Sequence, residues 1–214
     1  MTLHLRITEI FYSIQGESNT SGFPTVFVRL TGCPLRCQYC DTTYAFQGGK
    51  QLSMDNIMEQ VAAYQTPYVC ITGGEPLAQP NCIPLLRDLC DAGYQVSIET
   101  SGARDIAHID ARVTIVMDLK TPGSGEVDQN LWTNIPLLKA QDQIKFVLCH
   151  REDYLWACDM IKQYQLTKKA HILFSPSWGQ LNPTDLAEWI LADQLPVRFQ
   201  LQVHKVLWAD AQGR

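Results

Sequence analysis

The sequence predicts an α/β fold in which strands and helices alternate to form an incomplete, open barrel. Short apolar stretches recur along the whole chain, and helical patterns lie between several of them. The chain has 214 residues, whereas a complete eight-fold (β/α) barrel typically needs about 250. Because the pattern supports about six strand–helix units, we expect a partial (β/α)6-type, TIM-like barrel in a single domain that spans residues 1–214.

The predicted strands are mostly short, rich in β-branched residues and continuously apolar. Strands that are buried on both faces of a parallel sheet have this composition. The strands are expected at residues 7–14, 26–30, 68–71, 95–99, 113–119, 143–148, 171–174 and 198–203.

Four helices are predicted between these strands, at residues 54–64, 80–92, 153–165 and 183–193. Ser53 is the expected N-cap of the first helix, because its side chain can accept a hydrogen bond from the first helical turn. Gly93 stands where a glycine commonly follows the end of a helix. Residues 121–130 (TPGSGEVDQN) are predicted to form a long surface loop.

Composition narrows the classes of function. Seventeen Lys and Arg residues against twenty-two Asp and Glu residues give a net charge of −5, which argues against a broad basic face for nucleic acid. No apolar run approaches the ~18–20 residues of a membrane span, and the N-terminus lacks the apolar segment of a secretory signal. We therefore expect a reducing, cytoplasmic setting for the eight cysteines and neither nucleic acid nor a membrane as partner.

Three cysteines, Cys33, Cys37 and Cys40, are crowded into one octapeptide, CPLRCQYC. Their thiolates can converge from one loop onto a metal centre. A structural zinc site normally has four ligands, and neither a second CxxC nor a nearby His pair follows. Three protein ligands on a four-iron cluster leave one iron open, so the spacing favours a catalytic 4Fe–4S cluster. Four further cysteines are expected to be small core residues, Cys70, Cys90, Cys149 and Cys158, whereas Cys82 stays unassigned.

The segment TGGEP at residues 72–76 follows a predicted strand directly. Two glycines at a strand end let the backbone approach a ligand closely, and Glu75 offers an acceptor for an ammonium group. Taken alone, this segment would be assigned to a plain strand-to-helix turn. Its place one unit after the cysteine loop favours a binding role.

Together these two motifs, with the aromatic Tyr39 before the last cysteine, resemble the signature of the radical S-adenosylmethionine (SAM) superfamily. The resemblance implies a partial barrel of the radical SAM type. It also implies that Cys33, Cys37 and Cys40 hold a 4Fe–4S cluster whose open iron chelates SAM, and that Gly73, Gly74 and Glu75 bind SAM.

Six further segments resemble the 7-carboxy-7-deazaguanine synthase family and extend the similarity over nearly the whole chain: residues 9–18 (EIFYSIQGES), 26–33 (VFVRLTGC), 40–42 (CDT), 98–102 (IETSG), 142–147 (DQIKFV) and 202–208 (QVHKVLW). The family members are lyases of queuosine and deazapurine biosynthesis, which convert 6-carboxy-5,6,7,8-tetrahydropterin into 7-carboxy-7-deazaguanine with loss of ammonia. The resemblance further implies Mg²⁺, regeneration of SAM, a homodimer, and a flavodoxin- or ferredoxin-type reductant.

The resemblance also assigns roles to single residues. It places Thr42 on Mg²⁺, and it places two sets of residues on SAM and on the substrate. The SAM set adds Tyr39, Cys40, Asp41, Gly102, Gln143, Ile144 and Lys145. The substrate set is Ile14, Gln15, Gly16, Arg29 and Thr100. The chain departs from the family at Ser18, where many members have glycine, and at residues 117–120 (MDLK), where relatives often show Ser-Pro-Lys.

Arg29 lies in the middle of an apolar strand, where a lone charge is costly unless it is paired. A salt bridge is one explanation. We expect instead that its guanidinium grips the substrate carboxylate with two hydrogen bonds.

Two other classes of protein compete with the lyase. A glycyl-radical activating enzyme acts on a large partner protein, which would leave Gln15, Arg29 and Thr42 without roles. A non-enzymatic zinc module would lack its fourth ligand and would leave residues 72–76 unexplained.

Overall fold

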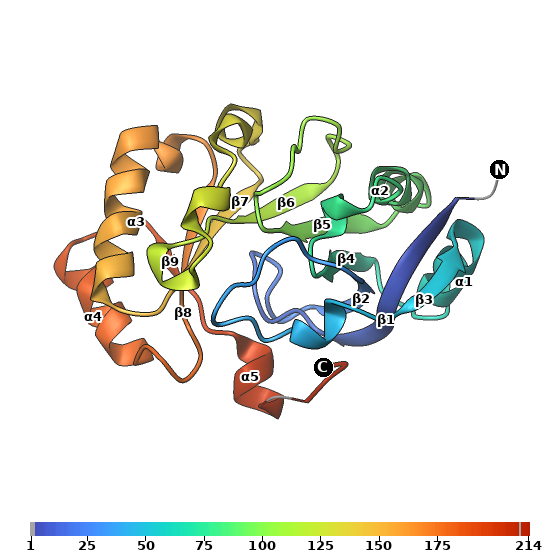
Figure 1. Cartoon of the computed structure of the whole chain (residues 1–214), viewed down its shortest axis with the longest axis horizontal. Coiled ribbons are helices and arrows are strands. Elements are labelled where there is room, and N and C mark those ends of the chain that lie inside the picture. The colour runs from blue at the N-terminus through green and yellow to red at the C-terminus, as the bar shows by residue number, and fades with distance from the viewer. Residues whose placement is uncertain (1–2, 210) are drawn as a thin grey trace.

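The computed structural model describes residues 3–209 and 211–214, and its strands form one open sheet (Figure 1). The order is β3-β1-β2-β4-β5-β6-β7-β8-β9. The strands are β1 (His4–Ile14), β2 (Pro24–Leu30), β3 (Lys50–Ser53), β4 (Tyr68–Gly73), β5 (Gln95–Thr100), β6 (Thr114–Asp118), β7 (Gln143–Leu148), β8 (His171–Pro176) and β9 (Arg198–Phe199). All neighbours from β2 to β9 are parallel, whereas β1 runs antiparallel to both β2 and β3. The predicted partial barrel is confirmed.

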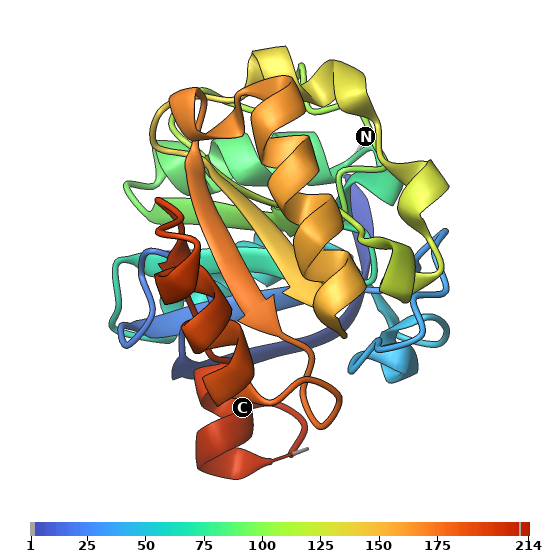
Figure 2. The same cartoon turned by 90° about the vertical axis from the view of Figure 1, so that its left-hand side faces the viewer.

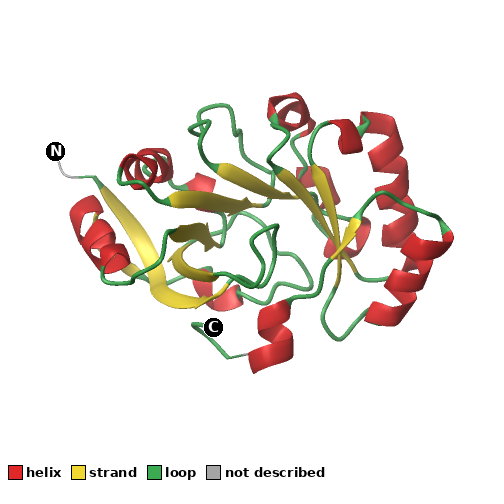
Figure 3. Cartoon of the chain, turned by 180° about the vertical axis from the view of Figure 1, so that it is seen from behind, coloured by secondary structure: helices red, strands yellow, loops and turns green. Residues whose placement is uncertain are grey.

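Four helices cover the outer face of this sheet, and the loops fill the inner side (Figure 3). They are α1 (Met54–Ala62), α2 (Cys82–Asp91), α3 (Arg151–Tyr164) and α4 (Pro183–Ala192), and a short α5 (Val203–Trp208) follows β9. Figure 2 shows α3 and α4 in front of the sheet, with β8 visible between them. Short 3-10 segments complete the structure: η1 (Thr43–Ala45), η2 (Pro76–Ala78), η3 (Pro122–Ser124), η4 (Val127–Gln129), η5 (Trp132–Leu137) and η6 (Leu166–Lys168).

The main core lies between the sheet and the helices. It includes Ile57 and Val61 of α1, Leu85 and Leu89 of α2, and Tyr154 of α3, which are all fully buried. The predicted N-cap is confirmed, because the Ser53 hydroxyl accepts a hydrogen bond from the Asn56 amide at 3.3 Å. No helix in the described part of the chain is long and apolar enough to cross a membrane.

The inner face of the sheet begins apolar and becomes polar along the strands. Cys70 of β4 packs there with Phe11 and Phe27, in a small cluster separate from the main core. One or two residues further along the strands, charged side chains such as Arg29 and Lys145 line a cavity. Both faces of the sheet are thus covered, which explains why the strands are so apolar in sequence.

The loop between β1 and β2, residues 15–23, crosses the inner side of the sheet and contacts its far end. We call it the bridging loop. Its Asn19 amide donates to Gln143 Oε1 of β7 at 2.7 Å, and its Asn19 Oδ1 accepts from Arg198 of β9 at 2.9 Å. The Ser18 carbonyl accepts from Gln200 at 2.9 Å, and the Gly16 carbonyl accepts from the Val203 amide at 3.2 Å. The first and last strands are therefore joined through this loop.

Ser18, in the middle of the bridging loop, adopts a φ of +150°. Residues with a side chain rarely occupy this region, and holding one there costs about 1–3 kcal/mol. The Ser18 hydroxyl partly offsets this cost, because it accepts from the Thr20 amide at 3.1 Å. The departure from the family's glycine therefore falls on a position that favours glycine.

Two predicted elements are wrong. The strand expected at 198–203 is limited to Arg198–Phe199, because Gln200 and Gln202 turn their side-chain amides to the bridging loop and α5 begins at Val203. The surface loop expected at 121–130 is folded into η3 and η4. Thr121 and Ser124 are fully buried there. The strand predicted at residues 7–14 is present as β1, but its antiparallel direction and the edge strand β3 were not predicted.

We expect Asp142→Ala to destabilise the fold strongly. Asp142 is fully buried, accepts hydrogen bonds from the Ile115 and Lys139 amides at 2.9 and 2.8 Å, and pairs with the Lys139 ammonium at 3.1 Å. Removal of its carboxylate leaves these donors without a partner, so the free energy of unfolding in urea should fall by about 3 kcal/mol. The exposed Asp159→Ala is the matched control, with an expected change within about 0.5 kcal/mol. Equal changes in the two variants would contradict this role.

Candidate active site

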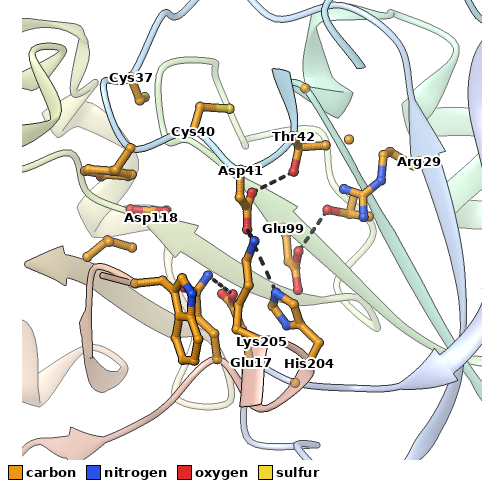
Figure 4. Close-up of a pocket in the computed structure, with 18 of the residues that line it drawn as sticks. Glu17, Arg29, Cys37, Cys40, Asp41, Thr42, Glu99, Asp118, His204 and Lys205 are labelled. Carbon is orange, nitrogen blue, oxygen red and sulfur yellow. Dashed lines mark hydrogen bonds and ion pairs between the residues drawn. The ribbon is translucent and has the colours of Figure 1, made fainter. Parts of the chain in front are cut away.

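A cavity of about 610 Å³ opens at the C-terminal ends of the parallel strands (Figure 4). The cysteine loop after β2, the glycine pair after β4 and Thr100 at the end of β5 contribute to its wall. β6, β7 and α5 add Asp118, Lys145 and His204. Strand C-terminal ends are where barrel enzymes place their chemistry.

The three predicted cluster ligands border this same cavity. Cys33, Cys37 and Cys40 are half-buried free thiols, and burial raises the pKa of all three, that of Cys37 to about 11. Arg36 stabilises their loop, since it donates to the Cys33 carbonyl at 2.8 Å and its guanidinium lies 4.3 Å from the Phe46 ring centroid. Within the described residues, no three His, Cys, Asp or Glu side chains converge closely enough to hold a single metal ion. The three thiols line one wall of the cavity, as the protein ligands of an iron–sulfur cluster would.

The other five cysteines are buried and free. This confirms the core positions predicted for Cys70, Cys90, Cys149 and Cys158 and gives Cys82 the same place.

The glycine pair seats the cysteine loop against β4. A Cβ on Gly74 would lie 2.2 Å from the Gly32 carbonyl oxygen, one residue before Cys33. Gly73 has a φ of +145°, and the Glu75 amide donates to the Gly32 carbonyl at 2.8 Å. Only residues without a side chain permit this close approach.

Glu75 itself does not reach the cavity. Its side chain is fully buried and already accepts hydrogen bonds from the Leu77 amide at 2.9 Å, the Thr100 hydroxyl at 2.9 Å and the Ser101 amide at 2.7 Å. The carboxylate therefore ties the end of β4 to the end of β5, and the structure does not place it where a ligand's ammonium group could bind.

The remaining predicted residues separate into two groups. Those that line the cavity are Ile14, Gln15, Gly16, Arg29, Tyr39, Asp41, Thr42, Gly73, Gly74, Thr100 and Lys145. Gly102, Gln143 and Ile144 do not. Ile144 belongs to the core, and Gln143 holds the bridging loop.

For Arg29, the salt bridge is present and the guanidinium still faces the cavity. Its Nε donates to Glu9 Oε1 at 2.8 Å, and the guanidinium lies 5.5 Å from the Phe11 ring and 5.8 Å from the Tyr44 ring. Tyr44 also donates to Glu9, at 2.8 Å. Among the described residues the two Nη groups have no hydrogen-bond partner, so they can bind a ligand while Glu9 orients the fork.

A chain of alternating charges on the cavity wall was not predicted. Lys145 Nζ donates to Glu17 and lies 3.7 Å from Asp118, which in turn pairs with Lys120 at 3.0 Å. Burial favours the neutral form of Lys145, but Glu17 and Asp118 hold its pKa above the ordinary value. A charged residue inside an apolar strand, such as Lys145, is the sequence signal that could have indicated these ion pairs, because a buried charge requires a partner. Sequence spacing does not reveal that the partner is Glu17, on the bridging loop.

Asp41 connects the cysteine loop to α5. Its carboxylate accepts from the Thr42 hydroxyl at 2.7 Å and lies 3.9 Å from both His204 Nε2 and Lys205 Nζ (Figure 4). Burial opposes its ionisation, but the hydrogen bonds from His204 and Thr42 and the charge of Lys205 hold the pKa of Asp41 well below its usual range.

This fold and this site define a class of enzyme. The sequence pattern of the radical SAM superfamily matches residues 27–175, so the chain belongs to that superfamily. Two relatives named 7-carboxy-7-deazaguanine synthase are similar over nearly their whole length. The one from Chlorobaculum tepidum is 46% identical over 98% of this chain and 97% of its own, and the one from Koribacter versatilis is 42% identical over 95% and 97%. Within the superfamily, the chain belongs to the 7-carboxy-7-deazaguanine synthase family.

Solved structures show the same fold. QueE from Escherichia coli has a TM-score of 0.76 at 23% sequence identity and covers 93% of this chain and 94% of its own. Streptococcus suis SuiB bound to precursor peptide SuiA has a TM-score of 0.55 over 80% of this chain and 46% of its own. The family resemblance is confirmed, and the relatives do not favour the glycyl-radical alternative.

We expect Gly74→Ala to displace the cysteine loop, because its Cβ would overlap the Gly32 carbonyl. The iron content of anaerobically reconstituted protein should fall severalfold, with a loss of stability of about 1–3 kcal/mol from overpacking. Gly93→Ala is the control. Gly93 has a φ of +90° but nothing lies within 4 Å of its added Cβ, so that variant should lose some stability and keep its iron. Full iron content in Gly74→Ala would contradict the seating role.

Proposed function

We propose that this chain is a 7-carboxy-7-deazaguanine synthase, which converts 6-carboxy-5,6,7,8-tetrahydropterin into 7-carboxy-7-deazaguanine with loss of ammonia. The observation that carries the proposal is a single cavity that brings the three thiols of the cysteine loop together with the Arg29 fork. Relatives with this name match the chain from end to end.

Membership of the superfamily implies a 4Fe–4S cluster and SAM as cofactors. When bound and reduced, these cofactors would supply the radical chemistry that removes hydrogen from C6 of the pterin. We propose Cys33, Cys37 and Cys40 as the cluster ligands. The glycine pair, Tyr39, Asp41 and Lys145 are proposed to hold SAM against this wall. Four residues of the predicted SAM set do not line the cavity, and we propose that they support the residues that do: Glu75, Gly102, Gln143 and Ile144.

The residues proposed to bind the substrate are Arg29 for its carboxylate and Ile14, Gln15, Gly16 and Thr100 for its ring system. Gln15 supports this assignment, because it is buried in the cavity wall and its Nε2 has no hydrogen-bond partner among the described residues. A buried donor without a partner is costly, and a polar ligand can supply the missing acceptor. The Glu17 amide donates to Gln15 Oε1 at 3.1 Å, which fixes the orientation of the side chain.

We further infer that Thr42 binds Mg²⁺. Its hydroxyl faces the cavity and donates to Asp41, so its oxygen lone pairs remain available to a hard cation. Water and substrate oxygens would complete the shell, as suits an ion that keeps several waters.

Other properties of the family are proposed on the same basis. Residues 1–214 would form one radical SAM domain, act as a homodimer and receive electrons from a flavodoxin- or ferredoxin-type protein. A cytoplasmic location is supported by the eight free thiols.

The activity is tested directly with reconstituted, reduced protein. Incubation with SAM, Mg²⁺ and carboxytetrahydropterin under anaerobic conditions should give carboxydeazaguanine, detected by mass spectrometry. The Cys33→Ala variant is the control and should lose both product and the brown absorbance of the cluster near ~400 nm. A wild-type protein that cleaves SAM but gives no product would contradict the proposal.

Arg29→Ala should weaken substrate binding by about 2–5 kcal/mol, the range for loss of one partner of a buried charge pair. Binding is measured without reductant, so that no turnover occurs. Arg87→Ala, on the exposed side of α2, should bind the substrate like the wild type. If Arg29→Ala binds the substrate as tightly as the wild type does, the role of Arg29 is limited to its structural salt bridge with Glu9.

A further inference from the structure

Four acidic side chains line the cavity, and one of them differs from the others. Glu17, Asp41 and Asp118 each lie within 4 Å of a Lys or His nitrogen. Glu99 has no such ion pair within the described residues. It accepts a hydrogen bond from the Thr72 hydroxyl on Oε2 at 2.8 Å, and the Cys70 thiol is a further polar neighbour. Burial and the charge of Glu17 raise the pKa of Glu99 by more than the charges of Lys145 and Arg29 and the hydrogen bond from Thr72 lower it.

The position of Glu99 relative to Arg29 is set by the register of the sheet. Arg29 of β2 pairs with Thr72 of β4, and β4 pairs with β5, which carries Glu99. Both side chains face the cavity, as Figure 4 shows, and their backbones are separated by two strand spacings, about 10 Å in all. The two side chains thus stand two strands apart on one cavity wall. A flat two-ring molecule that lies across the strands would meet Arg29 at its carboxylate end and Glu99 at its opposite edge.

The opposite edge of a pterin carries two adjacent donors, a ring N–H and the exocyclic 2-amino group. A ligand that offers two donors favours the ionised form of the carboxylate, which is acceptor-only and can accept from both donors with its two oxygens. An unpaired carboxylate in a largely buried wall is costly unless a ligand supplies donors. We propose that Glu99 is the specificity-determining residue that binds the N–H and 2-amino edge of the substrate, opposite the Arg29 fork. This inference rests on the proposed function. It adds that the Glu99 carboxylate is the protein group that distinguishes a pterin from its 2-oxo analogue.

The test compares wild type with Glu99→Gln on two ligands, carboxytetrahydropterin and the corresponding carboxytetrahydrolumazine, in which an oxo group replaces the 2-amino group. The wild type should bind the pterin at least about a hundredfold more tightly than the lumazine, because the 2-oxo group of the lumazine and the Glu99 carboxylate are both hydrogen-bond acceptors. Glu99→Gln should bind the pterin about ten- to a hundredfold more weakly. In Glu99→Gln the ratio of pterin affinity to lumazine affinity should fall at least tenfold, because the glutamine amide can donate a hydrogen bond to the oxo group.

Binding is measured at equilibrium without reductant, and KM and kcat are measured separately. Iron content and SAM affinity should stay at wild-type values in Glu99→Gln, which separates a ligand contact from a general disturbance of the site. Glu152→Gln, the same change on the exposed side of α3, is the matched control and should leave both ligands unaffected. If Glu99→Gln does not fold, Glu99→Asp carries the test. It should keep the preference for the pterin but bind it at least threefold more weakly, and unchanged affinity would overturn the inference.

A wild type that converts the substrate, beside a Glu99→Gln that keeps affinity and preference within twofold, would overturn the role of Glu99 and leave the proposed function standing. A wild type that neither binds nor converts the pterin would overturn both.

Discussion

The site depends on the bridging loop, which connects β1 and β2 on one side of the open sheet to β7 and β9 on the other. An open parallel sheet has no hydrogen bonds between its first and last strands, so contacts of another kind must hold its inner side together. In this chain the Lys145–Glu17 pair and the Gln143 and Gln200 side chains attach the loop to β7 and to the segment after β9. The cavity has a defined shape because this loop closes the side that a full barrel would close with strands.

Charge on the inner face is tolerated because most of it is paired. A buried ion pair contributes little net stability, but loss of one partner leaves the other charge without compensation and is strongly destabilising. The chain Glu17–Lys145–Asp118–Lys120 therefore specifies the arrangement of β6, β7 and the bridging loop. It also leaves the cavity polar, as a charged substrate and cofactor require. We assign to the ligand the Arg29 Nη nitrogens, which have no hydrogen-bond partner among the described residues, and the Glu99 carboxylate, which has no ion pair among them.

Local features could be predicted from the sequence, and distant pairings could not. The Ser53 cap and the strands β1, β2 and β4 to β8 depend on patterns among neighbouring residues, and these predictions are confirmed by the structure. The crowding of three cysteines in one loop is likewise a local pattern. The Glu17–Lys145 pair spans 128 residues and has no local pattern. Residues 200–203 show the alternation of a strand, but the bridging loop accepts their hydrogen bonds in place of a neighbouring strand. The role of Glu75 could not be predicted for the same reason. Its motif is visible in the sequence, but the four hydrogen bonds that its carboxylate accepts come from groups that the fold brings together at the ends of two strands.

We propose that substrate and SAM share the cavity that unites the cysteine loop with the Arg29 fork. The most direct measurement uses carboxytetrahydropterin with deuterium at C6 and follows the label by mass spectrometry during anaerobic turnover. If the two molecules lie side by side in this cavity, deuterium will appear at the 5′ carbon of the adenosyl group. Formation of carboxydeazaguanine with no label on that carbon would contradict the account.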